Sequence, residues 1–113
     1  MNPEADYAYV TTTGRRTGRA HEIEIWFAAA GDTLYLLSGG GERSDWVRNL
    51  IADPRVTVRV ESEEVPAKAR TVEDPEEDGR ARRLLLEKYE PRYRGSLERW
   101  GLTATPVALV LEP

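Results

Sequence analysis

Short runs of alternating apolar residues constrain the fold of this sequence more than any other feature. In the run RVTVRV, Val56, Val58 and Val60 alternate with polar residues, so an extended chain has one apolar face. Residues 21–27 alternate in the same way, and Val107, Leu109 and Leu111 recur at the same spacing. This period of two is typical of half-buried antiparallel strands. We therefore expect a mainly β (α+β) protein.

The remaining patterns extend this expectation to six strands. The expected strands cover residues 7–13, 21–27, 33–38, 56–60, 65–72 and 107–111. Gly31-Asp32 is predicted to form a tight turn before the third strand, and Glu63-Glu64 to separate the fourth strand from the fifth. Six short strands fit a closed or nearly closed antiparallel barrel better than a doubly wound sheet, because closure removes exposed strand edges.

Capping residues predict two or three short helices. Ser44 is a candidate N-cap of a first helix. Asp74 is a candidate N-cap of a second helix, with proline at the first helical position and glutamate three residues on, and this helix runs towards Tyr89. A further helical turn over residues 96–100 is expected to end at Gly101.

Length and composition limit the kind of protein. The 113 residues have the size of one domain, so we expect a single domain over 1–113. The chain has no cysteine and one histidine, which excludes thiol nucleophiles and cysteine-based metal sites, and no metal is expected. The net charge of −4 argues against nucleic-acid binding. No apolar run has membrane-spanning length and the start lacks a signal-peptide pattern, so we expect a cytoplasmic protein without membrane contact.

The segment from Gly14 to Arg19 is a candidate anion site. It places Arg15, Arg16 and Thr17 between two glycines, and Gly18 is the second of them. Backbone amides at a glycine turn can point at an anion while arginines bind its oxygens. The alternative is a solvated hairpin turn that needs glycine and tolerates arginine.

A glycine loop before the first helix is the second candidate. Together with the first residues of the helix it comprises Ser38, Gly39, Gly40, Gly41, Glu42, Arg43, Ser44, Asp45 and Trp46. Glycines allow a flat or phosphorylated ligand close to the main chain, and the start of a helix favours an anion. The sequence has no Walker lysine and no strand–GxGxxG–helix unit, which excludes a P-loop ATPase and a Rossmann dinucleotide-binding domain. The alternative is a flexible connector.

Aromatic and polar residues beside these loops could border a planar ring. Trp26 and Trp46 are candidates, and Asn49 lies one helical turn after Trp46. His21 could shuttle a proton or contact phosphate. The alternatives are tryptophans in the core and a histidine on the surface. The late aromatic residues that could cover the same pocket, or equally lie in the core, are Tyr89, Tyr93 and Trp100.

Three segments together resemble the deazaflavin-dependent nitroreductase family, whose members bind coenzyme F420 or sometimes a flavin. The segments are YVTTTGRRTG, SGGGERSDWVRNL and ADPRVTVRV. The resemblance implies an FMN-binding-like split β-barrel, with the arginine turn and the glycine loop holding the phosphate and tail of the cofactor. The residues carried over by match are Arg15, Arg16, Thr17, Gly18, Ser38, Gly40, Gly41, Trp46 and Asn49.

The resemblance also implies that His21, Glu24 and Trp26 lie on a strand beside the cofactor ring. Many members have lysine where this chain has Gly39, and we expect Arg43 to replace that positive charge. The longer N-terminal segment of some nitro-reducing members is absent.

The resulting hypothesis is an oxidoreductase that transfers a hydride from reduced F420 to a small electrophilic organic substrate. Such an enzyme needs little acid–base machinery, because the cofactor supplies the chemistry. We name no catalytic residue. Positive charge spread over both loops predicts tighter binding of F420 than of FMN. The alternatives are an FMN oxidoreductase like pyridoxamine phosphate oxidase, a non-catalytic carrier and an anion-binding interaction module. Related barrels often dimerise, so a homodimer is possible.

Overall fold

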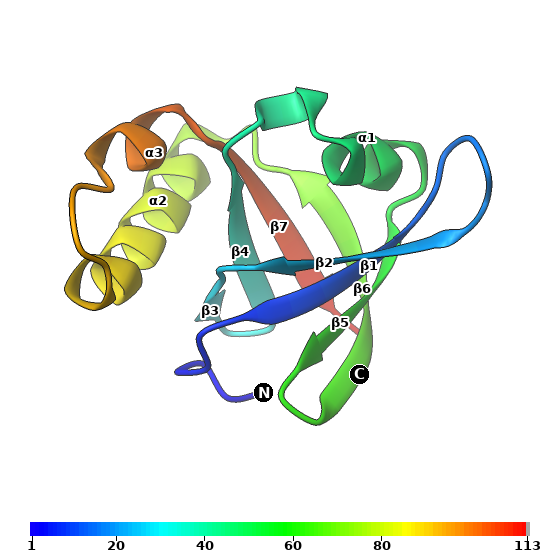
Figure 1. Cartoon of the computed structure of the whole chain (residues 1–113), viewed down its shortest axis with the longest axis horizontal. Coiled ribbons are helices and arrows are strands. Elements are labelled where there is room, and N and C mark those ends of the chain that lie inside the picture. Colours follow the sequence, from blue (N-terminus) through cyan, green and yellow to red (C-terminus); the bar gives the residue numbers. More distant parts are fainter. Residues whose placement is uncertain (113) are drawn as a thin grey trace.

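Seven antiparallel strands form one curled sheet in the computed structural model, which describes residues 1–112 (Figure 1). The order across the sheet is β2-β1-β5-β6-β7-β4-β3. The strands are β1 (Ala8–Thr13), β2 (Ala20–Ile25), β3 (Ala28–Ala30), β4 (Thr33–Ser38), β5 (Arg55–Val60), β6 (Glu63–Thr71) and β7 (Thr105–Leu111). The predicted split-barrel class is confirmed, but the count of six strands was wrong.

The extra strand arises because the predicted strand over residues 21–27 is divided. Its first part, β2, pairs with β1. After Trp26 and Phe27 the chain continues as β3, which pairs with β4 at the other end of the sheet order. The same stretch of chain thus supplies both end strands of the sheet and connects them covalently, which curls the sheet towards a barrel.

Two side chains of α2 (Pro75–Tyr89) satisfy the peptide groups at this break. The backbone N–H of Phe27 donates to the hydroxyl of Tyr89 at 3.0 Å, and Lys88 Nζ donates to the carbonyl of Phe27 at 2.8 Å. Lys88 also bonds the carbonyl of Ala5 at 2.7 Å, and the Tyr89 hydroxyl donates to that of Asp6 at 2.8 Å. Buried peptide groups need such partners. Burial lowers the pKa of Lys88 to about 8 and raises the pKa of Tyr89 to about 12.

The hydrophobic core has two parts, one on each face of β4. Leu34 and Leu36 belong to the cluster inside the curl of the sheet, together with Phe27. Tyr35 and Leu37 point the other way, into a cluster under α2 and α3 (Glu98–Thr103). Both faces of β4 are therefore buried, which explains why its sequence is a continuous apolar run and not an alternating one.

The helices largely follow the predicted caps. Helix α1 (Asp45–Ala52) begins after Ser44, but the Ser44 side chain makes no capping bond to it. Helix α2 begins after Asp74, whose carboxylate accepts from the N–H of Glu77 at 3.0 Å, as predicted. Gly101 does not end α3 but lies within it. A Cβ at this glycine would approach Leu86 of α2 to 2.7 Å, so glycine permits close packing of the two helices.

The turn between β5 and β6 differs from the prediction. Glu63 and Glu64 are the first residues of β6, and the turn is formed by Glu61 and Ser62. Glu61 has a φ of 56°, a left-handed conformation that few residues other than glycine adopt. Because a hairpin register depends on turn geometry, the strand begins two residues earlier than the apolar pattern indicates.

An ion pair and a phenol tie the start of α2 to the sheet. Arg70 of β6 makes a bidentate contact with the Glu77 carboxylate at 2.7 and 2.8 Å, and Tyr35 donates to the same group at 2.7 Å. Hydrogen bonds from Arg70, and next from Tyr35, lower the pKa of Glu77 to about 2. Ionised Glu77 therefore favours the folded state.

We expect Glu77→Gln to destabilise the protein at neutral pH by about 1–2 kcal/mol, a value reduced for the solvent exposure of Arg70. The extra stability of the wild type is fully present above 4.5, the ordinary pKa of a glutamate, and is lost as the pH falls towards about 2, the pKa of Glu77 in the folded state. Urea unfolding at several pH values measures it. A constant difference between wild type and variant down to pH 2 would contradict this account.

Tyr89→Phe tests the polar bridge at Phe27. The ring remains to stack on Trp26, with centroids 4.3 Å apart, but the buried N–H of Phe27 loses its acceptor. We expect a loss of about 1–3 kcal/mol in the free energy of unfolding. Tyr93→Phe is the matched control, because Tyr93 is exposed and no hydrogen bond of its hydroxyl occurs within residues 1–112. Equal effects of the two substitutions would argue against the bridge.

Candidate functional site

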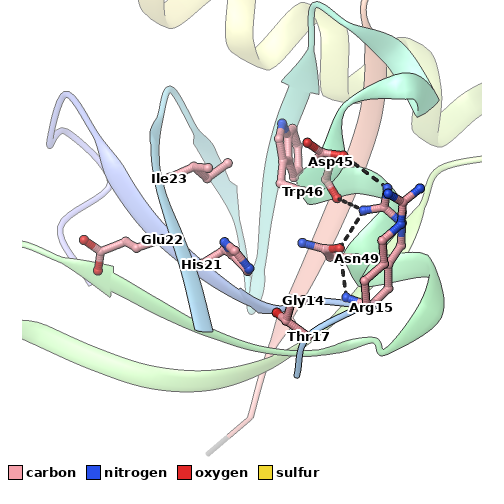
Figure 2. A pocket seen from close by; sticks show the side chains of 10 residues that line it. Gly14, Arg15, Thr17, His21, Glu22, Ile23, Asp45, Trp46 and Asn49 are labelled. Atoms are coloured by element: carbon pink, nitrogen blue, oxygen red, sulfur yellow. Dashed lines mark hydrogen bonds and ion pairs between the residues drawn. The ribbon is translucent and has the colours of Figure 1, made fainter. Parts of the chain in front are cut away.

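An open cleft of about 420 Å³ lies between the β1–β2 turn and α1 (Figure 2). β2 forms one side and α1 the opposite side, and the turn closes one end. The residues that line the cleft are Gly14, Arg15, Arg16, Thr17, His21, Glu22, Ile23, Asp45, Trp46 and Asn49. Its size is within the range of small-molecule and cofactor pockets.

Helical spacing decides which side of α1 faces the cleft. Asp45, Trp46 and Asn49 lie at positions i, i+1 and i+4, which share one side of a helix. Val47 and Leu50 are fully buried and point into the core. The amphipathic sequence of α1 therefore presents a tryptophan and two polar side chains to the cleft. The opposite side of the helix packs into the core.

The arginine turn has a compact hydrogen-bonded form. The N–H of Gly14 donates to the carbonyl of Arg19 at 2.7 Å, and the N–H of Gly18 donates to that of Gly14 at 2.8 Å. Gly18 has a φ of 73°, which favours glycine. A Cβ on Gly14 would lie 2.7 Å from Nε2 of His21. Both glycines are therefore required by geometry, whatever the arginines do.

Asn49 fastens this turn to α1 and β1. Its Oδ1 accepts from the backbone N–H of Arg15 at 3.2 Å and from Arg15 Nη1 at 2.8 Å, and its Nδ2 donates to Thr12 Oγ1 at 3.3 Å. Arg15 Nη2 also pairs with Asp45 Oδ1 at 3.1 Å. Arg15 is thus engaged by the protein itself, and Asn49 is a buried positioning residue.

The cleft combines an apolar wall with a cationic mouth. Ile23 and Trp46 face each other across it (Figure 2). Arg16, Thr17 and His21 lie at the turn side. Within residues 1–112, no ion pair involves Arg16, so its guanidinium is available to an anion. This arrangement suits a flat ring with an anionic substituent.

The structure brings together six of the residues that the sequence singled out, and places others elsewhere. Arg15, Arg16, Thr17, His21, Trp46 and Asn49 line the cleft, whereas Gly18 completes the turn beside it. Glu24 accepts from the Tyr9 hydroxyl at 2.7 Å on the outer side of the sheet. Trp26 stacks on Tyr89 and has edge contacts with Tyr93 and Trp100. Tyr89 and Trp100 pack in the second core cluster, whereas Tyr93 is exposed.

The glycine loop does not line the cleft but leads into α1. Residues 41–43 form a short 3-10 helix, η1 (Gly41–Arg43), and Gly39 and Gly40 are exposed. Ser38 Oγ donates to the carbonyl of Gly41 at 3.0 Å and lies 3.0 Å from Ser44 Oγ. The two serines therefore stabilise the loop, and Arg43 is exposed upon it.

Two of the lining residues, Glu22 and Ile23, were not named from the sequence as candidates for the site, although both belong to the strand expected beside the ring. The signal for Ile23 was present, since its alternation placed it on the apolar face that here forms a cleft wall. Gly14 and Asp45 lie within the two predicted segments.

Residues 1–112 contain neither a cluster of metal-binding side chains nor a membrane-spanning helix. No group of three or more histidine, cysteine, aspartate or glutamate residues there could hold a metal ion. No helix in the same range is long and apolar enough to cross a membrane.

The sequence matches the family model described as F420H(2)-dependent quinone reductase over residues 2–110. The chain belongs to this family. The F420-dependent reductase predicted from the sequence is thereby confirmed at the level of the family, although the family description names a quinone where the resemblance named nitro compounds. F420 is accordingly the cofactor that the family implies.

Several solved structures share the fold. One, described as an F420-H2 dependent reductase, is 19% identical with a TM-score of 0.74, covering 92% of this chain and 93% of that one. Another, described as a domain-swapped dimer, is 21% identical with a TM-score of 0.74 and coverages of 92% and 79%. A third, a putative pyridoxamine 5'-phosphate oxidase from Listeria innocua, is 17% identical with a TM-score of 0.70 and coverages of 96% and 85%. For this chain a homodimer stays a prediction.

We expect Asn49→Ala to release the arginine turn from α1. Removing the amide leaves the N–H of Arg15 and the hydroxyl of Thr12 without their partner, and costs about 1–3 kcal/mol of stability. Hydrogen exchange of the Arg15 amide should accelerate more than that of the β5 amides. Arg48→Ala, an exposed neighbour on the same helix, is the control. Unchanged exchange at Arg15 would contradict the positioning role of Asn49.

Proposed function

We propose that the cleft between the β1–β2 turn and α1 holds the ring and phosphate of F420, and that the chain transfers a hydride from reduced F420 to a quinone. The observation that carries this proposal is a cleft with an apolar wall and with Arg16 at its mouth, an arginine that forms no ion pair within residues 1–112. Membership of the family supports the cofactor and the class of acceptor.

The residues of the cleft fit such a cofactor. A planar ring can lie between Ile23 and Trp46, where both apolar area and an aromatic face are available. Arg16 and the hydroxyl of Thr17 can hold an anionic oxygen next to the turn. The cleft is too small for the whole of F420, so its acidic tail would extend over the exposed surface near η1 and α1.

The reaction places few chemical demands on the protein. When bound, reduced F420 supplies the hydride, and a quinone that receives a hydride and a proton becomes the hydroquinone. The protein contributes binding and orientation through the rigid wall made by α1. The proton comes from solvent, which reaches the exposed His21 at the edge of the cleft.

Positive charge around the cleft favours F420 over FMN. Arg16 and Arg19 lie on the turn, Arg43 on η1 and Arg48 on α1, and all four are exposed. None of the four forms an ion pair within residues 1–112. F420 has a phosphodiester and an acidic tail, whereas FMN has one compact phosphate. A spread of separate arginines therefore suits the longer anionic ligand.

We expect F420 to bind more tightly than FMN at low ionic strength, with the preference shrinking as salt rises because exposed charges are screened. Arg16→Ala should weaken F420 binding about three- to thirtyfold, the effect of losing a charge-assisted contact. Arg83→Ala is the control, because it removes an equal charge from the exposed side of α2. F420 fluorescence titration measures both effects.

Three outcomes would overturn parts of this proposal. Equal or tighter binding of FMN at both ionic strengths would favour the FMN oxidoreductase. Tight F420 binding without oxidation of reduced F420 by a soluble quinone, followed by absorbance, would favour a carrier. A weakening by Arg83→Ala equal to that by Arg16→Ala would remove the cleft as the site.

A further inference from the structure

The cleft contains a negative charge where an anionic ligand would be expected to bind. Asp45 Oδ1 lies 3.1 Å from Arg15 Nη2, and both residues line the cleft (Figure 2). Asp45 is also the first residue of α1, where the helix dipole favours a negative charge. Its carboxylate therefore already lies where the Arg15 guanidinium and the N-terminus of α1 would attract an anion.

The two members of this ion pair are held very differently. The side chain of Arg15 is 21% exposed, and its Nη1 donates to Asn49 Oδ1 at 2.8 Å. The backbone N–H of Arg15 donates to the same oxygen at 3.2 Å. The side chain of Asp45 is 85% exposed, and within residues 1–112 its carboxylate has Arg15 as its single ion-pair partner. Exposed ion pairs contribute little free energy, so Asp45 can leave at small cost while Arg15 stays in place.

The other carboxylate of the cleft is engaged elsewhere. Glu22 Oε2 lies 3.7 Å from Nη2 of Arg59 on β5, which lies on the other side of β1 from β2. Asp45 is therefore the acidic side chain that neutralises an arginine of the cleft itself, among the residues that the structure describes. An incoming phosphate that contacts Arg15 has to compete with this carboxylate.

We propose that Asp45 is an internal counter-ion, which an anionic group of the cofactor displaces from Arg15, and that it thereby sets the affinity and salt dependence of the cleft. This inference rests on the proposed function for the identity of the anion. It assigns to Asp45 the role of a specificity residue: ligands with too little negative charge to displace the carboxylate bind weakly. Arg15 then serves both the turn and the ligand.

Removing the charge of Asp45 tests this role. Asp45→Asn should raise the affinity for F420 about three- to tenfold at low ionic strength, the range expected for an exposed charge pair, and the gain should shrink in high salt. Glu42→Gln is the matched control, because Glu42 is an exposed carboxylate on η1 without a contact to Arg15. It should change the affinity less than twofold. Equal effects of the two variants would overturn the proposal.

A double-mutant cycle shows whether Asp45 acts through Arg15. In an Arg15→Gln background, Asp45→Asn should lose its additional gain and behave like Glu42→Gln. Thermal unfolding of each variant checks that the fold is kept. A gain that persists without Arg15 would show a general charge effect and overturn the displacement mechanism.

Inorganic phosphate separates failure of this inference from failure of the proposed function. NMR titration follows the Nε–H signal of Arg15 in wild type, Asp45→Asn and Glu42→Gln. If no form binds F420 but Asp45→Asn binds phosphate more tightly than both others, the proposed cofactor is wrong and the counter-ion role stands. If F420 binds and Asp45→Asn shows no selective gain with either ligand, the cofactor stands and the counter-ion role is wrong.

Discussion

The curled sheet depends on how the backbone N–H and carbonyl of Phe27 are satisfied. At this residue the chain stops pairing with β1 and begins to pair with β4, and neither strand provides a partner for these two groups. Tyr89 accepts from the N–H and Lys88 donates to the carbonyl, at 3.0 and 2.8 Å. A buried peptide group without partners would cost several kcal/mol, so the curl of the sheet requires that α2 be docked. Helix α2 is thus part of the β structure.

The site depends on a second polar connection of the same kind. Asn49 is only 4% exposed and joins β1, the arginine turn and α1 through one amide. The first strand and its turn therefore share one fixed geometry with α1, which lies 34 residues further along the chain at Asn49. The cleft walls are thus set before any ligand arrives. Such preorganisation is what a hydride-transfer enzyme needs from its protein, because the alignment of cofactor and acceptor determines the rate.

Two neighbouring arginines of the turn differ in how the protein holds them. Arg15 is held by Asn49 and paired with Asp45, whereas Arg16 has no ion-pair partner within residues 1–112. Guanidinium groups suit both roles because they combine several donors in a rigid plane with a permanent charge. Arg15 thus has a structural role that Arg16 lacks, although the two residues look equivalent in the sequence.

The sequence alone determined the features that arise within a few residues: the alternating strands, the Asp74 cap of α2, the glycine turn and the face of α1 that carries Trp46 and Asn49. Tertiary structure decided the partners. Asn49 meets Arg15 across 34 residues and Phe27 meets Tyr89 across 62, and no local pattern records either pairing. Trp26 likewise stacks on Tyr89 because α2 packs beside β3, which follows Trp26 in the chain. Periodicity and capping depend on neighbouring residues, whereas the break after β2 and the side chains that meet in the cleft depend on how distant elements pack.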